Sequence, residues 1–411
     1  MPELFHCQVL VGPELEPVPC ERFSWDEDGI SAIEPAKNPS EADAWERVIM
    51  PAMINGHTHV GDGFLADGAA GLTLEEGFFR PNGFKYRELE KVDRPTHIQA
   101  LETVLRGMAA SGTVIHLDFR EQGAEGASRL REASEVVGLQ SIILNQFQDP
   151  PFDEETLESN VARLPAAAGD ELDSMLKVAD GFSESTMNDL PDPAWEQIAE
   201  LTHARGKLRA IHVVENAGYR STSVERTGRG DVARALDLFE PHLVVHMTDA
   251  SSAEIELVRR SRVPVAINPR ANATLALPAP PLEAMMKAGL PLILGTDNVM
   301  LNPPNLFAEM DYCWKLARSQ QDDPRWPDPL DILKMTTVNG GDRRFHPSYT
   351  GIMETGGPAN FLVLDFSAPH LRYSRNLHAS LVGRVTPADI LATFFQGDLL
   401  YHHPKWETII H

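Results

Sequence analysis

Apolar segments alternate with amphipathic helical stretches over most of the chain, and this alternation constrains the fold more than any other feature. Such alternation predicts parallel βαβ units, because a crossover helix must connect each strand to its parallel neighbour. Eight units of this kind close most economically into a barrel, so we predict an α/β protein with a TIM-like (β/α)8 barrel. The predicted strands are 47–59, 113–119, 139–147, 175–183, 208–215, 242–248, 263–269 and 291–298.

The segments before and after this alternating region consist of short apolar stretches separated by turn residues, which is typical of strands and turns. Residues 25–35 contain an Asp-Gly turn at 28–29 between apolar stretches, which predicts a hairpin. Residues 359–366 and 390–402 also read as strands. We therefore predict that residues 1–50 and 345–411 form one small β-sandwich, and that residues 51–344 form the barrel.

The charge balance excludes several classes of partner. The 411-residue chain has 60 acidic and 36 basic residues, which gives a net charge of −24. Such a surface repels phosphate backbones and anionic lipid, so we expect no nucleic acid and no membrane partner. No apolar run approaches the roughly 18 residues of a membrane span, and three scattered cysteines predict no disulfide framework. We expect a cytoplasmic protein with a small-molecule substrate, and leave open whether it is a homo-oligomer.

Polar residues gather where the predicted strands end. The carboxyl ends of barrel strands converge on one face, where active sites lie. Any one of these residues alone would not indicate a functional site, since a single histidine is more often a surface residue or a hydrogen-bonded core residue. Their shared position instead predicts a metal site, because imidazoles with a carboxylate suit zinc or iron(II). The residues are His57 and His59 on the first strand, His212 and Glu215 on the fifth, His246 on the sixth and Asp297 on the eighth.

At these residues the chain resembles the amidohydrolase superfamily, most closely its mononuclear branch of cytosine, adenosine-type and S-adenosylhomocysteine-type deaminases and chlorohydrolases. The similar stretches include PAMINGHTH, IHVVENA, VVHMTDAS and GTDNVML, and the likeness runs from about 48 to 345. The resemblance implies one divalent metal, zinc with iron as the alternative. It also implies roles: His57, His59, His212 and Asp297 bind the metal, Glu215 shuttles protons, and His246 stands beside the attacking water.

Two departures from the family pattern are visible. The seventh strand continues as NPRANATLA where many members have Cys-Pro-x-Ser-Asn, so Asn268 and Ala271 differ. The binuclear branches use a carboxylated lysine at the end of the fourth strand. Lys177 lies near the start of our predicted fourth strand, which is too far from the metal for that role.

These observations predict a metal-dependent hydrolase that acts on carbon–nitrogen bonds other than peptide bonds. We expect an aminohydrolase (deaminase) that releases ammonia from an aminated heterocycle or nucleoside-like substrate by attack of metal-bound hydroxide, with Asp297 accepting the water proton. The alternatives are a cyclic amide or imide hydrolase, a chlorohydrolase of the same superfamily, and a non-catalytic barrel paralogue.

Substrate recognition must come from the loops after the strands. The candidates are Asp62, Lys85, Arg120 and Arg270. An arginine at a barrel mouth can bind a carboxylate or phosphate, although a surface salt bridge is its commoner role. We expect the long insert between residues 60 and 95 to form a lid.

Overall fold

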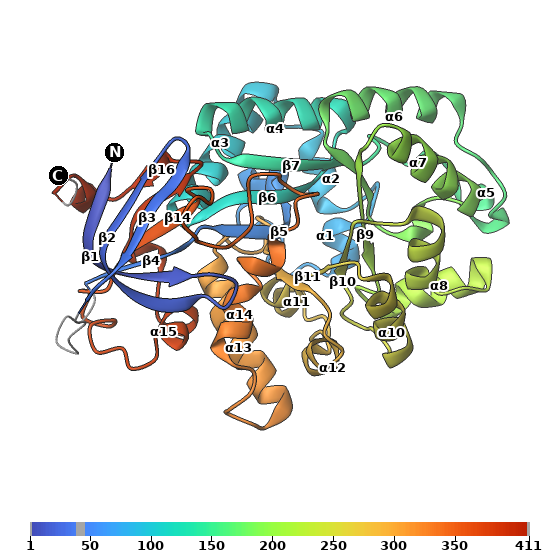
Figure 1. Ribbon diagram of the computed structural model, residues 1–411. Helices are drawn as coiled ribbons and strands as arrows, with labels where there is room; N and C mark the ends of the chain where they lie inside the picture. Colours follow the sequence, from blue (N-terminus) through green and yellow to red (C-terminus); the bar gives the residue numbers. More distant parts are fainter. Residues whose placement is uncertain (1, 38–45, 409–411) are drawn as a thin grey trace.

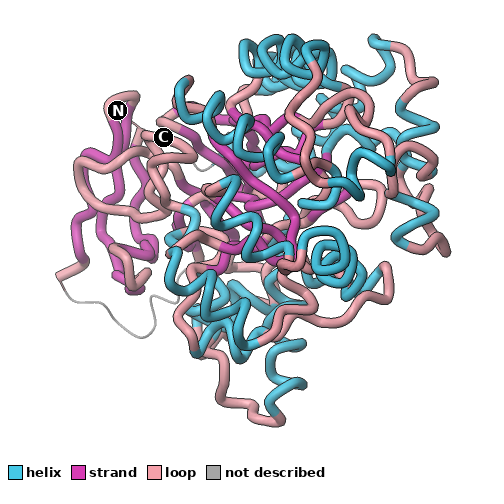
Figure 2. The backbone as a smooth tube through the Cα atoms, turned by 90° about the vertical axis from the view of Figure 1, so that its right-hand side faces the viewer, coloured by secondary structure: helices cyan, strands magenta, loops and turns pink. Residues whose placement is uncertain are grey.

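The computed structural model describes residues 2–37 and 46–408. Parallel strands form the centre of the molecule and helices surround them, while a separate sheet lies to one side and contains segments from both ends of the chain (Figures 1 and 2). None of the described helices combines the length and the apolar character needed to cross a membrane.

The central sheet is a closed barrel of parallel strands. Its last strand is interrupted at Gly295 and Thr296: the Gly295 N–H donates to Ile267 O (2.9 Å) on one side, and the Thr296 N–H donates to His57 O (3.0 Å) on the other. The second half of this strand pairs with the first strand of the barrel, so the predicted barrel is confirmed. In spatial order the strands are β12 (Leu292–Leu294), β11 (Val265–Ile267), β10 (Leu243–His246), β9 (Leu208–Val213), β8 (Gly181–Glu184), β7 (Gln140–Asn145), β6 (Thr113–Arg120), β5 (Met53–His59) and β13 (Asp297–Asn298).

Helices cover the outside of the barrel, and their ends follow local sequence signals. The side chain of Asp93 caps α3 by accepting the Thr96 N–H (3.0 Å), and the helix then buries Leu101, Leu105 and Met108. The helices are α1 (Leu74–Phe78), α2 (Phe84–Leu89), α3 (Arg94–Ala110), α4 (Gly123–Val137), α5 (Glu154–Ser159), α6 (Ala166–Val178), α7 (Asp192–Ala204), α8 (Ala217–Thr227), α9 (Asp231–Arg234), α10 (Ser252–Ser261), α11 (Pro269–Thr274), α12 (Leu282–Lys287), α13 (Leu306–Gln321), α14 (Pro329–Lys334) and α15 (Leu377–Gly383).

The outer sheet curls until its two ends face each other. Phe23 of β2 packs against Phe361 of β14 with ring centroids 5.0 Å apart, and Trp25 of β2 lies 5.1 Å from Phe394 of β15. Since β4 and β1 separate these strands in the sheet, the contacts close a sandwich around an apolar core, as predicted. Its order is β16 (Asp398–His402), β15 (Ile390–Phe395), β14 (Phe361–Asp365), β4 (Arg47–Pro51), β1 (Glu3–Val11), β2 (Glu16–Asp26) and β3 (Gly29–Pro35).

Two predicted strands differ from the structure. The first, 47–59, is two strands: β4 belongs to the outer sheet and only β5 to the barrel. The fourth, 175–183, begins as the last turn of α6, and the strand starts at Gly181. Met175 and Leu176 are buried as part of a helix face, and a short apolar run does not distinguish this from a strand. Lys177 is therefore an exposed helical residue and does not lie in a strand.

Candidate active site

The polar residues at the strand ends converge at one end of the barrel. Nitrogen and oxygen atoms from them form three groups, and within each group the atoms lie no more than 4.8 Å apart. All members are buried, so their donor atoms face one another instead of bulk solvent. The groups are His57, His212 and His246; His57, His59 and Asp297; and Glu215, His246 and Asp297.

The backbone is strained where these side chains leave the strands. Val214, His246, Met247 and Asp297 have φ values of 39°, 73°, 54° and 62°, a region that residues with a Cβ rarely adopt, β-branched ones least of all. The Val214 N–H donates to the buried Asp231 carboxylate (2.8 Å), which holds the turn that carries the next residue into the site. Backbone strain of this kind clusters at functional sites, and these four residues all lie at strand ends that face the cluster.

Hydrogen bonds fix the orientation of two of the histidine rings. His59 Nδ1 donates to Glu121 Oε1 (2.8 Å), and His212 Nδ1 donates to the backbone carbonyl of Glu184 (3.0 Å). The Nε2 atom of each ring therefore keeps its lone pair and faces the cluster. Metal-binding histidines are oriented in the same way, with one nitrogen bonded to an oxygen behind the ring.

His57 provides the test of whether a metal fits. Its Nε2 lies 3.3 Å from Asp297 Oδ1, yet neither ring nitrogen has a hydrogen-bond partner within the described residues. Burial lowers the pKa of His57 to about 3, so the ring is a neutral imidazole, which is the form that binds metals. Leaving such a group buried and unpaired is costly. A cation coordinated at this point would remove the cost, so the donor set fits a divalent metal.

Glu215 stands beside this cluster in a defined orientation. The hydroxyl of Tyr219, in the first turn of α8, donates to Glu215 Oε2 (2.9 Å), and Glu215 Oε1 lies 3.7 Å from His246 Nε2. Burial raises the pKa of the Glu215 carboxyl. Sequence reasoning missed Tyr219. Its position four residues after Glu215, at the start of a helix, was the one available signal.

The departure from the family motif on the seventh strand lies directly against His246. The side-chain amide of Asn268 donates to His246 Nδ1 at 3.4 Å. With Nδ1 as the acceptor, the proton of a neutral His246 ring is on Nε2, which faces Glu215. Asn268 thus selects the tautomer of His246.

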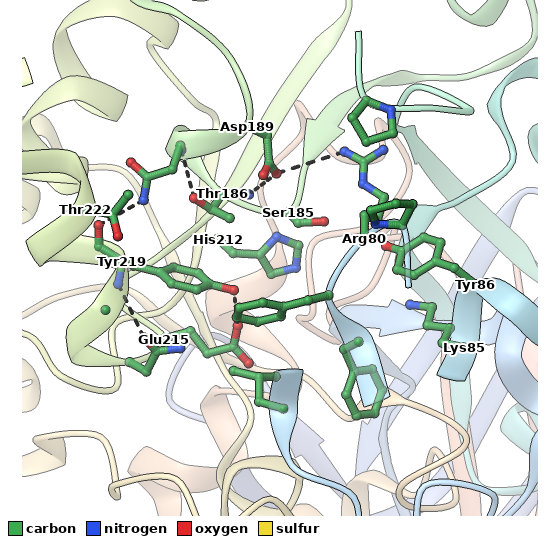
Figure 3. Close-up of a pocket in the computed structure, with 18 of the residues that line it drawn as sticks. Arg80, Lys85, Tyr86, Ser185, Thr186, Asp189, His212, Glu215, Tyr219 and Thr222 are labelled. Atoms are coloured by element: carbon green, nitrogen blue, oxygen red, sulfur yellow. Dashed lines mark hydrogen bonds and ion pairs between the residues drawn. The ribbon is translucent and has the colours of Figure 1, made fainter. Parts of the chain in front are cut away.

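A cavity of about 460 Å³ opens in front of the cluster. Figure 3 shows Tyr219 and Glu215 on one side of it and Arg80, Lys85 and Tyr86 on the other. The insert 60–95 supplies much of the wall, and its action as a lid stays a prediction. The lining residues are His59, Leu74, Phe78, Phe79, Arg80, Pro81, Lys85, Tyr86, Pro150, Phe152, Glu154, Leu157, Ser185, Thr186, Asn188, Asp189, His212, Glu215, Asn216, Gly218, Tyr219, Thr222, Arg226, His246, Asp297 and Asn298.

Of the four residues predicted to bind substrate, only Lys85 lines the cavity. Asp62 is buried behind it and accepts hydrogen bonds from the Asn298 side chain (2.7 Å) and the Met300 N–H (3.0 Å). Arg120 is buried against Glu121, and Arg270 Nη1 lies 3.8 Å from a carboxylate oxygen of Glu309. These three side chains support the walls of the site and do not face the space that a substrate would fill.

Glu121, which the sequence did not single out, connects the insert to the histidine cluster. Its carboxylate contacts Lys85, Arg120 and His59. Burial alone would raise its pKa, but Lys85 and Arg120 hold the pKa of Glu121 well below its usual range. An ionised carboxylate therefore lies behind His59 and holds the orientation of its ring.

Comparison with known proteins gives consistent results. A model described as "Amidohydrolase family" matches residues 48–400. The chain is 33% identical over 397 residues to a "Putative aminohydrolase" of Methanothermobacter thermautotrophicus, covering 95% of this chain and 97% of the relative. It is 26% identical over 379 residues to the 5-methylthioadenosine/S-adenosylhomocysteine deaminase of Caldanaerobacter subterraneus, covering 89% and 83%.

Among solved structures, an adenosine deaminase from Xanthomonas campestris with bound zinc superposes with a TM-score of 0.77 at 19% identity, covering 95% of this chain and 91% of that one. That structural similarity supports the fold alone, whereas the family model and the relatives are matches of sequence and support the family. Together with the converged cluster they confirm the predicted superfamily. The chain is a hydrolase of carbon–nitrogen bonds and belongs to the amidohydrolase family.

Proposed function

We propose that this protein is a deaminase with one zinc ion, and that it releases ammonia from an aminated heterocycle or nucleoside-like substrate. The observation that carries the proposal is the position of Glu215. Its free oxygen faces His246 Nε2 at 3.7 Å, next to a cluster of donor atoms suited to a metal and at the inner end of a substrate-sized cavity. Deamination needs a proton donor at this point, whereas a binding protein does not.

His57, His59, His212 and Asp297 would hold the metal. When bound, a divalent metal of this kind makes hydroxide available at neutral pH. Nitrogen and carboxylate donors suit zinc, and zinc is bound in the similar adenosine deaminase structure. A single ion is supported by the fourth strand, which ends at Glu184, while Lys177 is exposed on α6.

Protein side chains carry out the proton transfers and orient the nucleophile. Asp297 accepts the proton of the attacking water, and the N–H on His246 Nε2 orients the nucleophile toward the substrate carbon. As hydroxide adds to that sp² carbon, Glu215 Oε1 delivers a proton to the adjacent ring nitrogen. The hydroxyl proton of the resulting adduct passes through Glu215 to the amino group, the bond from the carbon to that group breaks, and ammonia leaves. The proton held by Asp297 then returns to Glu215, so both carboxyl groups regain their starting states.

The relatives support this substrate class, since one of them is named for the deamination of adenosine derivatives. Purified zinc-loaded protein should release ammonia from at least one compound in a panel of adenosine, 5'-deoxyadenosine, guanine and cytosine. The matched control is Glu215→Gln, which keeps the size of the side chain but cannot transfer a proton.

Ring opening of a cyclic imide without ammonia release, or chloride release from a chlorinated heterocycle, would assign one of the alternative reactions instead.

Elemental analysis tests the metal: we expect about one zinc per chain. Two metals per chain would contradict the mononuclear assignment.

A further inference from the structure

Three basic side chains line the described part of the cavity, and each already contacts a carboxylate. They are Arg80, Lys85 and Arg226. A basic group in a substrate cavity usually suggests a phosphate or carboxylate on the substrate. Such an interaction requires the basic group to be free, so the partners of each one matter.

Arg80 is held inside the wall. One guanidinium nitrogen contacts Glu184 and lies 4.0 Å from Asp189, and the other donates to the Phe147 carbonyl (3.0 Å). The arginine side chain is 7% exposed and the Glu184 side chain is fully buried. Separating this pair would leave an uncompensated buried charge on both sides, which is strongly unfavourable.

Lys85 is engaged in the same way at the inner end of the cavity. Its ammonium group contacts Glu121, and the side chains are 3% and 1% exposed. Glu121 also accepts from His59, so moving Lys85 toward a substrate would disturb the histidine cluster. Neither Lys85 nor Arg80 is available to an anion.

Arg226 differs because its partner is accessible to solvent. It contacts Glu154 of α5 and donates to the Asn188 carbonyl (3.0 Å). The arginine side chain is 15% exposed, whereas the Glu154 side chain is 68% exposed. This pair therefore lies at the outer end of the cavity. Of the three cations in the described lining, Arg226 is the one that a substrate could approach without breaking a buried pair, and Glu154 neutralises it.

Every cation of this lining is matched by a carboxylate. Glu154 contacts Arg226 and Asp189 lies 4.0 Å from Arg80, and Glu184 and Glu121 lie directly behind Arg80 and Lys85. An incoming anion would therefore meet cations that are already paired and, at the outer end, the exposed carboxylate of Glu154. Like charges placed together at a binding surface reject a ligand even where its shape fits.

We infer that the cavity selects an aminated heterocycle that carries no anionic group, and that Glu154 excludes phosphorylated analogues by neutralising Arg226. The inference rests on the proposed function and narrows its substrate class. It replaces the expectation that an arginine at the barrel mouth binds a phosphate.

Matched pairs of compounds test the inference: adenosine, cytidine and guanosine, each against its 5'-monophosphate. For zinc-loaded wild-type protein, at the lowest salt concentration that keeps it folded, we expect each monophosphate to be at least about 100-fold worse in kcat/KM than its nucleoside. In Glu154→Gln the ratio of the nucleoside kcat/KM to the monophosphate kcat/KM should fall by about tenfold, because the kcat/KM for the monophosphate rises. Glu155→Gln, an equal charge change at an exposed residue of α5 that does not line the cavity, should leave the ratio of nucleoside to monophosphate kcat/KM unchanged.

A titration with inorganic phosphate, followed by calorimetry, separates this inference from the proposed function. We expect Glu154→Gln to bind phosphate about tenfold more tightly than the wild type, and Glu155→Gln to match the wild type. Absence of ammonia release from all six compounds would count against the deaminase alone. Equal use of monophosphate and nucleoside by the wild type, or no gain of phosphate binding in Glu154→Gln, would overturn the charge selection.

Discussion

The two ends of the cavity are built differently. At the inner end, the functional side chains come from the ends of β5, β9, β10 and β13 and are buried. At the outer end, the wall comes from the insert, α5 and α8, and includes the exposed side chains of Phe79 and Glu154. From this difference we expect the barrel residues to set the chemistry and the loops to set the substrate, so changes at the two ends should affect different kinetic constants.

The largest effect is expected at the inner end, from His57→Ala. Neither nitrogen of this ring has a hydrogen-bond partner within the described residues, and we propose that the ring binds the metal directly. Its removal should therefore weaken metal binding by more than the roughly 10–100-fold expected for a residue that only supports a ligand. Activity should fall with it. Metal content after gel filtration measures the loss, and His402→Ala at an exposed site of β16 is the control. Full retention of metal in His57→Ala would mean that the cluster is not the metal site.

Glu215→Gln should separate proton transfer from metal binding. We expect the variant to keep its metal and its substrate affinity and to lose about 10²–10⁴ in kcat, the usual range for general acid–base catalysis. Metal analysis beside steady-state kinetics gives both values. Near-normal turnover would show that Glu215 is structural, and the deaminase mechanism would have to be abandoned.

Tyr219→Phe should have a smaller effect of the same kind. It removes the hydrogen bond to Glu215 Oε2 and keeps the ring, so we expect kcat to fall about 5–10-fold, in line with about 1 kcal/mol for one hydrogen bond, with little change in KM. Because the hydroxyl acts through Glu215, combining this change with Glu215→Gln should add little. Strictly multiplicative losses in the double variant would rule out that coupling.

The smallest effect is expected at the rim, from Phe79→Ala. The Phe79 side chain lines the cavity but is 40% exposed, so little apolar area depends on it in the free protein. We expect KM to rise by less than about tenfold while kcat stays within twofold, since one partly buried apolar contact contributes about 1 kcal/mol. A loss in kcat comparable to that of Glu215→Gln would show that the rim and the inner end do not act separately.

The same comparison explains how much the sequence revealed. His57, His59, His212, His246 and Asp297 could be placed together because parallel barrel strands all end at one face, whatever the loops do. Tyr219 and Arg80 could not, since no periodicity relates a loop or insert to the strand it will contact. Glu121 directly follows β6, so the same argument could have included it, although the sequence analysis did not single it out. The boundary of β8 was wrong for a related reason: four residues are too few to carry a pattern.

The interruption of the last barrel strand has a consequence for how the chain folds. Asp297 lies beside His57 at the seam between the first and last strands, and Asn55 donates to Thr296 Oγ1 (2.8 Å) across the same seam, although 241 positions separate them in the chain. Docking these two strands closes a very long loop, which is entropically costly, so we expect it to occur late in folding. A metal bound by residues of both strands would hold the closed barrel together. A barrel in which these strands have not yet paired would lack the complete metal site. Metal uptake should therefore report on completion of the fold, and chelation should open the molecule first at this seam.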